Sequence, residues 1–211
     1  MIHIIPADEA DFAVLAKIMA LALQPGCVDR VLYKEYNHAA AAVDFALSSI
    51  KELNTRPNAR IIKAVLNSSN EIVGYAAATF YKAGHDKAAI SKEETTPSYI
   101  NEQFSDDYYG ALSQKRRQHM AGKDYCHWNK LMVLPSYQKM GIGSQLLSWG
   151  LASWPIGNNP VYLSAQLEGH KLYQNFGWQD VDEIILDLGK YMPPFSGYGL
   201  HKTVCMIKPP Q

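Results

Sequence analysis

The sequence predicts a fold that mixes α-helices and β-strands, and three observations support this. Two segments, 12–23 and 43–53, carry apolar residues at helical spacing. Two β-rich runs, 60–66 and 72–81, are joined by an Asn-Ser-Ser-Asn turn, which predicts an antiparallel hairpin. A third region, 125–151, has the pattern of a strand, a glycine-containing loop and a helix.

Short local signals bound the N-terminal elements. Residues 3–5 favour a strand that ends at Pro6, and Asp8 stands where its side chain can cap the next helix. That helix is expected to end at Pro25, and the second one before Pro57.

The middle of the chain is polar. Residues 84–110 predict an excursion from the core that can act as a lid. A basic helix is expected over 111–121, and we interpret its charges as a solvated face, with an anion site as the alternative. Strands are expected over 160–165, 182–188 and 200–207.

Composition disfavours a charge-driven binder. Hydrophobic residues make up 47% and charged residues 19% of the 211 residues, so a substantial core can form. Twenty Lys+Arg balance twenty Asp+Glu, and a net charge of +0 provides no broad field for nucleic acid or an anionic membrane. The apolar segment 12–23 is shorter than the ~20 residues of a membrane span, so we expect no membrane partner.

The cysteines indicate a reducing compartment. There are three, they are far apart, and their spacing fits neither a disulfide framework nor a metal site: Cys27, Cys126 and Cys205. Asp8 and Glu9 stand where a signal peptide would be basic. We therefore expect no metal and a cytoplasmic location, with the nucleus left open.

The loop 138–143 is the most informative feature of the sequence. It follows a strand and leads into a helix whose first-turn N–H groups converge on one spot, and its glycines allow an anion to approach the backbone. A P-loop is disfavoured because no Gly-Lys-Ser/Thr follows, and a dinucleotide fingerprint because Leu146 replaces its third glycine.

These residues resemble the GCN5-related N-acetyltransferase (GNAT) superfamily. Gln138-x-x-Gly141-x-Gly143 after 131–135 is similar to the family's loop for the pyrophosphate of acetyl-coenzyme A, and 169–178 is similar to its helix ending in Leu-Tyr-x-x-x-Gly-Phe. The resemblance implies one domain over 1–211 with an insertion at about 84–124. It also implies a mixed, mostly antiparallel central sheet with splayed central strands and flanking helices.

The resemblance further implies acetyl-CoA as cosubstrate, and an N-acetyltransferase that acts on a primary amine. Met132 and Val133 would offer backbone groups to the pantetheine, and Lys139 would either add charge near the phosphates or face solvent. The loop that would wrap the pyrophosphate consists of Gln138, Lys139, Met140, Gly141, Ile142, Gly143 and Ser144.

Two residues are candidates for proton transfer. The resemblance implies that Tyr173 donates a proton to the departing thiolate, with ring packing as the alternative. His127 lies on the strand that would line the cleft, where a base is needed to deprotonate an amine, and a hydrogen bond within the core explains it equally well. Asp124 is a weaker candidate for the base.

Strand alternation places His127, Asn129, Leu131 and Val133 on one face and Cys126 on the other, unless a bulge intervenes. Cys126 and His127 therefore face opposite ways, which disfavours a nucleophilic thiol–imidazole pair.

The acceptor is expected to be a small-molecule amine. The resemblance implies that the aromatic loop 191–199 borders the acceptor pocket, with Tyr108 and Tyr109 facing that loop, which favours an apolar or aromatic acceptor. The alternative is that 191–199 is an ordinary packed loop. Two alternatives stay open: a protein lysine or N-terminal acetyltransferase, and a noncatalytic CoA-binding regulatory protein. The sequence leaves the oligomeric state undetermined.

Overall fold

The computed structural model describes residues 1–24, 26–34, 39–84 and 97–210. The chain divides into two compact units. The first comprises Met1–Pro25, His38–Phe80 and Cys126–Gly157, and the second comprises Gly26–Asn37, Tyr81–Tyr125 and Asn158–Gln211. The single domain expected over the whole chain stays a prediction.

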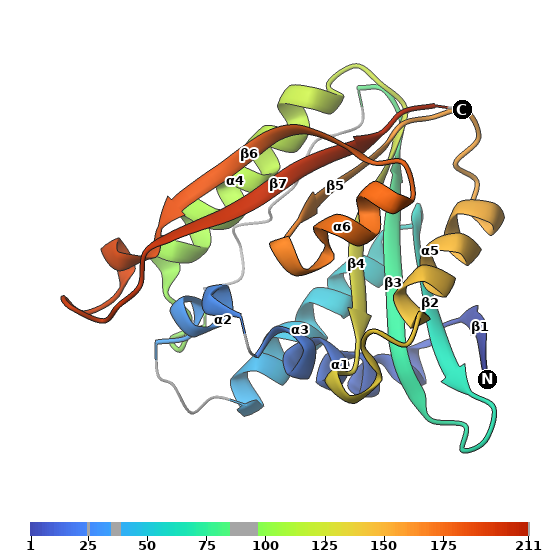
Figure 1. The fold of residues 1–211 in the computed structure, drawn as a ribbon, viewed down its shortest axis with the longest axis horizontal. Helices are drawn as coiled ribbons and strands as arrows, with labels where there is room; N and C mark the ends of the chain where they lie inside the picture. The colour runs from blue at the N-terminus through green and yellow to red at the C-terminus, as the bar shows by residue number, and fades with distance from the viewer. Residues whose placement is uncertain (25, 35–38, 85–96, 211) are drawn as a thin grey trace. The chain divides into compact units, whose positions relative to one another are not determined.

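The first unit holds four strands, in the order β1-β2-β3-β4 (Figure 1). β1 pairs with β2, and β2 with β3, in antiparallel register, so the predicted hairpin is confirmed. The elements are β1 (Ile2–Pro6), η1 (Glu9–Asp11), α1 (Phe12–Leu23), α3 (Ala39–Thr55), β2 (Ala59–Leu66), β3 (Ile72–Tyr81), β4 (Tyr125–Val133), η2 (Pro135–Tyr137) and α5 (Ile142–Ser153).

The core of this unit forms where α1 and α3 pack together against one face of the strands (Figure 1). Phe12, Leu15 and Met19 of α1 meet Ile50 of α3 and Tyr75 of β3 in one apolar cluster. These are the periodic positions that predicted both helices, and removing their apolar surface from water stabilises the unit. Asp8 caps η1, the short 3-10 helix that leads into α1: its carboxylate accepts from the Ala10 N–H at 3.0 Å.

The second unit holds three strands, in the order β5-β7-β6, and both pairs are antiparallel. Figure 1 shows α4 lying along them. The elements are α2 (Cys27–Leu32), α4 (Glu102–Met120), β5 (Val161–Ala165), α6 (Leu167–Asn175), β6 (Gln179–Asp187), η3 (Leu188–Tyr191) and β7 (Leu200–Lys208).

Helix α4 corrects one prediction. It begins at Glu102, so the polar excursion expected up to Gly110 ends earlier, and residues 85–96 of the expected lid lie outside the described residues. The helix starts there because the Asn101 side chain accepts from the Phe104 N–H at 3.2 Å. Phe104 and Tyr108, one turn apart, are both buried.

The basic residues of α4 serve the fold. Lys115 donates to Asp182 at 2.8 Å, and the Asp182 carboxylate lies 3.0 Å from the ring of His119. Arg116 is buried and donates to the Tyr125 hydroxyl at 2.8 Å. Ion pairs with β6 and a bond with Tyr125 occupy these groups, so no anion site forms from them.

The predicted fold class is confirmed: the chain mixes helices with mostly antiparallel strands, and helices flank those strands. The splay expected between two central strands stays a prediction. Among the described residues, no helix is long and apolar enough to cross a membrane. The three cysteines are free thiols, as expected.

Candidate cofactor and catalytic site

The loop between β4 and α5 takes the shape of an anion cradle. Gly141 is the N-cap of α5 and has a φ of 80°, in the left-handed region that favours glycine, and Lys139 also has a positive φ, of 61°. Ile142, the first helical residue, is buried and anchors the loop. Lys139 and Met140 are exposed.

The N-terminus of α5 is available to a ligand. In the described part of the chain no side chain caps it, because the N-cap residue is a glycine. A Cβ built on Gly141 would meet no atom within 4 Å, so the space beside the loop is open. The first-turn N–H groups and the positive end of the helix dipole favour a phosphate there. The residues present therefore fit the pyrophosphate of coenzyme A.

Gln138 has a positioning role that the sequence does not reveal. Its side-chain amide donates to the carbonyl of Val133 at 3.1 Å, which ties the loop back to the end of β4. A second missed residue is Gly74 of β3, where a Cβ would lie 2.8 Å from the carbonyl oxygen of Met132. Glycine is needed there because any side chain would push the end of β4 away.

Helix α5 is held in place by tryptophans. A Cβ on Gly150 would lie 2.6 Å from the Trp128 ring and 2.9 Å from the Trp154 ring, and the two rings are 4.7 Å apart. The absent side chain lets α5 pack closely over β4. Leu146 and Leu147, at the predicted apolar positions, are fully buried.

The side chains of β4 do not alternate strictly between the two faces of the strand. Thr79, on the same face of β3 as the core residue Tyr75, donates to Asn129 at 2.8 Å, and Asn129 in turn bonds to His127. Met132 packs against that same core cluster. Because 129 and 132 differ by an odd number, the alternation is interrupted between them. The bond between His127 and Asn129 agrees with the prediction that they share a face, and the interruption after Asn129 is the exception that the prediction allowed for.

His127 is half-buried, and its Nδ1 lies 3.1 Å from the Asn129 amide nitrogen. With the Asn129 oxygen accepting from Thr79, the amide donates to Nδ1, and the neutral ring then carries its proton on Nε2. A base that works through Nε2 needs the other tautomer, which requires the Asn129 amide to turn over. The orientation of this amide therefore controls whether His127 can accept a proton at Nε2.

Two other candidates behave as structural groups. Lys82 donates to the Asp124 carboxylate at 2.7 Å and the Ala83 N–H at 2.9 Å, which holds the pKa of that carboxyl below its usual value and makes it a poor base. Burial raises the pKa of the Cys126 thiol to about 12. Cys126 is therefore a poor nucleophile, as predicted.

Tyr173 lies on α6 in the second unit, whereas His127 and the loop 138–144 belong to the first. Its ring occupies the space that Gly169 leaves, because a Cβ there would lie 3.1 Å from the ring, and it meets the Trp178 ring edge-on at 5.8 Å. The room expected beside Gly169 is thus taken by the tyrosine itself. Burial raises the pKa of Tyr173, so its hydroxyl holds its proton at neutral pH.

The aromatic loop expected to border the acceptor packs on α4. The Tyr191 hydroxyl donates to Asp107 at 2.7 Å, and its ring lies 5.1 Å from that of Phe104. Phe104 stacks on Tyr108 at 5.5 Å, and Tyr108 meets Tyr109 at 5.3 Å. Aromatic rings therefore gather where Tyr191 packs on α4 in the second unit.

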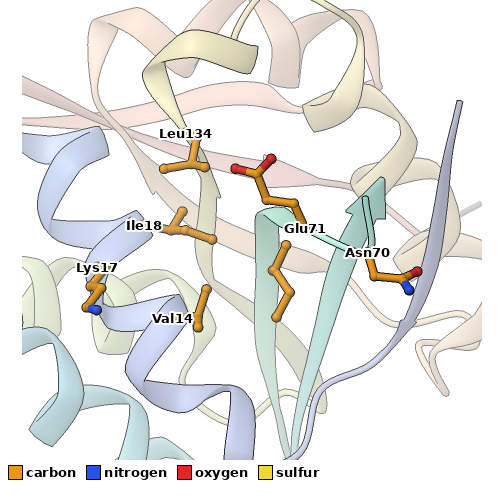
Figure 2. A pocket seen from close by; sticks show the side chains of 7 residues that line it. Val14, Lys17, Ile18, Asn70, Glu71 and Leu134 are labelled. Carbon is orange, nitrogen blue, oxygen red and sulfur yellow. The ribbon is translucent and has the colours of Figure 1, made fainter. Parts of the chain in front are cut away.

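A pocket of about 370 Å³ lies in the first unit, between α1, the turn before β3 and Leu134 (Figure 2). Its walls are Val14, Lys17, Ile18, Asn70, Glu71, Ile72 and Leu134. It contains none of the predicted site residues. At its edge the Tyr137 hydroxyl donates to Glu71 at 3.0 Å, which links the pocket to the segment that precedes the cradle.

Part of the chain matches a known family model. Residues 102–180 match the family model described as the acetyltransferase (GNAT) domain, a region that runs from α4 through α6. A search of curated protein sequences finds no match to the chain. The predicted resemblance is confirmed: the matched region contains both the α5 loop and the α6 segment that carried it. The insertion expected at about 84–124 stays a prediction.

Solved structures share the fold at low sequence identity. A mosquito arylalkylamine N-acetyltransferase like 5b is 15% identical with a TM-score of 0.67, covering 99% of both chains. A histone acetyltransferase HPA2 and related acetyltransferase from Corynebacterium glutamicum is 19% identical, with a TM-score of 0.60 and coverage of 100% of this chain and 97% of its own. PaiA N-acetyltransferase from Thermoplasma acidophilum, solved with coenzyme A, is 13% identical with a TM-score of 0.57, covering 99% of both chains.

In the part of the chain that the structure describes, no group of three or more His, Cys, Asp or Glu side chains gathers as a metal ion would require. In the first unit, the backbone N–H groups at the start of α5 are the groups suited to bind an anion.

Proposed function

We propose that this chain is an acetyl-CoA-dependent N-acetyltransferase that acetylates the primary amine of a small molecule by direct attack in a ternary complex. The observation that carries the proposal is the uncapped, open N-terminus of α5 behind Gly141, inside the region that matches the GNAT domain. The relatives of known fold include one solved with coenzyme A, which supports the same cosubstrate.

The cradle would hold the pyrophosphate, and the end of β4 the pantetheine. The N–H groups from Gly141 to Ser144 would hold the diphosphate by donating hydrogen bonds to it, without a metal ion. Gln138 holds the loop to Val133, so its bond is a positioning contact. When bound, acetyl-CoA supplies the acetyl thioester, and Met132 and Val133 are the backbone positions nearest the cradle on β4.

Two proton movements complete the chemistry. An alkylamine with a pKa near ~10 is mostly ammonium at pH 7, so it must lose a proton before it attacks. His127 is the proposed acceptor of that proton at Nε2, in the tautomer that forms when the Asn129 amide turns over. Tyr173, which holds its proton at neutral pH, is the proposed donor to the leaving thiolate.

The aromatic side of the second unit supports an apolar or aromatic amine. Tyr191 is half-buried and packs on the buried ring of Phe104, so its ring can offer apolar surface to a substrate body. One relative of like fold is named an arylalkylamine N-acetyltransferase and another a histone acetyltransferase, so the comparisons leave both acceptor classes represented. The cytoplasmic location stays a prediction.

An amine panel tests the proposal. The full chain is incubated with acetyl-CoA and arylalkylamines, alkylamines, or peptides bearing lysines or free N-termini, with thiol release followed and products identified by mass. We expect amine-dependent release that is fastest with an aryl-bearing small amine. Turnover confined to peptides would refute the small-molecule acceptor, and binding of acetyl-CoA without turnover on any amine would indicate a noncatalytic protein.

His127 can be tested through its pH signature. If it is the base, activity requires the neutral ring, so kcat/KM falls as pH drops through its pKa, and His127→Ala removes this acidic limb. Asn129→Asp places a carboxylate beside Nδ1, which stabilises the imidazolium, raises its pKa and moves the limb to higher pH. A limb that stays in place in both variants would return His127 to a packing role.

A further inference from the structure

A second pocket, of about 410 Å³, lies in the second unit between α2 and the residues that lead into β7. Leu188 and Leu200 supply apolar wall, and Cys27 and Arg30 of α2 supply polar groups. Cys27 is half-buried, so its thiol is within reach of a small molecule in the pocket.

The thiol of Cys27 belongs to a hydrogen-bonded array. Its Sγ lies 3.3 Å from Nδ1 of His201, and Nε2 of His201 lies 3.2 Å from the hydroxyl of Thr203. Thr203 is buried, and its hydroxyl lies 3.4 Å from that of Tyr108. The imidazole is thereby held between a thiol on one side and a fixed hydroxyl on the other.

The proton positions in this array allow His201 to act as a base toward Cys27. Burial lowers the pKa of His201, so the ring is neutral at neutral pH. With Nε2–H donating to Thr203, the Nδ1 lone pair faces the thiol. A nucleophile, a base in hydrogen-bond reach and a third group that orients the base are the signature of an activated nucleophile.

The other two cysteines lack these features. Burial raises the pKa of Cys126 to about 12 and also raises that of Cys205. Neither lines this pocket. They serve as internal controls, because a thiol-directed reagent that reacts by accessibility and ionisation should leave both untouched.

We propose that Cys27 is a nucleophilic site that accepts an acyl group from a thioester, with His201 as its base and Thr203 as a positioning residue. The Cys27 thiol passes its proton to Nδ1, and its sulfur attacks the thioester carbonyl. The bond from that carbonyl to the leaving sulfur then breaks, and the leaving thiolate takes the proton from His201. The products are S-acyl-Cys27 and a free thiol, with no oxidant or reductant required.

This reaction is separate from direct transfer to an amine, but it rests on the proposed function in one respect, since acetyl-CoA is the thioester that function provides. A small thioester that lacks the nucleotide removes this dependence. S-Acetyl-N-acetylcysteamine is such a probe, because it offers the same acetyl thioester without a pyrophosphate for the α5 cradle.

The test incubates the full chain with either S-acetyl-N-acetylcysteamine or acetyl-CoA, and follows acetylation by intact mass and peptide mapping. We expect one acetyl group, on Cys27, removed by hydroxylamine and absent in Cys27→Ser. The rate should exceed that of free N-acetylcysteine roughly 10²-fold or more, as a positioned base contributes. Labelling of Cys27 by the small thioester alone, with no acetyl-CoA present, separates this site from the cofactor cradle.

The pH profile tests the roles of His201 and Thr203. In His201→Gln the acidic limb should move toward ~8.5, where a free thiol ionises. Thr203→Val should lower the rate without changing the product, because it removes only the orienting hydroxyl. In the described part of the chain, the other charged or titratable groups around the pair include Asp29 and Arg30 of α2, Tyr108 of α4, Glu168 of α6 and Tyr198 of the pocket wall.

Three results would overturn the proposal. They are acetylation of Cys27 no faster than that of N-acetylcysteine, equal labelling of Cys126 or Cys205, and a pH profile unchanged in His201→Gln.

Discussion

Gly141→Glu is expected to weaken acetyl-CoA binding by roughly 10²–10³-fold while the protein stays folded. The new carboxylate would stand where the diphosphate meets the first turn of α5, and two unit charges about 4 Å apart repel by about 4 kcal/mol at a surface-like effective dielectric. Each 1.4 kcal/mol or so is a factor of ten in affinity. Titration calorimetry with acetyl-CoA and with free coenzyme A measures the loss.

The matched control for this variant is Gly122→Glu. Gly122 follows α4, has a φ of 73°, and a Cβ there would meet no atom within 4 Å, so the substitution imposes the same backbone strain with the same carboxylate. Its Tm should fall by a similar amount while its affinity for acetyl-CoA stays native. Native affinity in a folded Gly141→Glu protein would refute the cradle as the cofactor site.

The elements of the site were predictable because each depends on local signals. The strand up to Val133, the break at Pro135 and the start of α5 after Gly141 all follow from hydrophobic periodicity and turn chemistry within a few residues. The left-handed backbone at Gly141 is a conformation that glycine adopts without strain.

What the sequence could not supply depends on contacts between distant residues. The shift of sides along β4 appears only when Thr79 meets Asn129, fifty residues apart. Cys27 and His201 are 174 residues apart, and no spacing rule relates them. Strand alternation predicted correctly that Cys126 would be inert, but it gave no indication of the array at Cys27.

The start of helix α4 is a further feature that the sequence did not predict. Its first turns are polar in sequence, and their helical state depends on the Asn101 cap and on burial of Phe104 against Tyr191. Tertiary packing therefore overrode a composition that is typical of a loop. The same packing is what gathers aromatic rings on the side proposed for the acceptor.

Tyr173 is the residue whose proposed role is most sharply separable from packing. Its ring fills the space over Gly169 and meets Trp178 edge-on, and Phe would keep both contacts. Burial raises the pKa of its hydroxyl, so that hydroxyl is a donor across the range in which an amine can be acetylated. Replacing Tyr173 by Phe therefore removes the hydroxyl group, which is the proton donor, and keeps the packing of the ring.

Tyr173→Phe is therefore expected to lower kcat by roughly 10²–10⁴-fold, the usual contribution of a positioned general acid, with the Kd for acetyl-CoA unchanged. The deficit should shrink with an acyl donor whose leaving thiol is more acidic, because a better leaving group needs less protonation. Tyr162→Phe is the matched control, since burial also raises the pKa of Tyr162 and its hydroxyl lies 3.3 Å from that of Ser164, outside the proposed catalytic residues. Near-native kcat in Tyr173→Phe would assign that ring to packing and leave proximity of the bound reactants as the main source of rate.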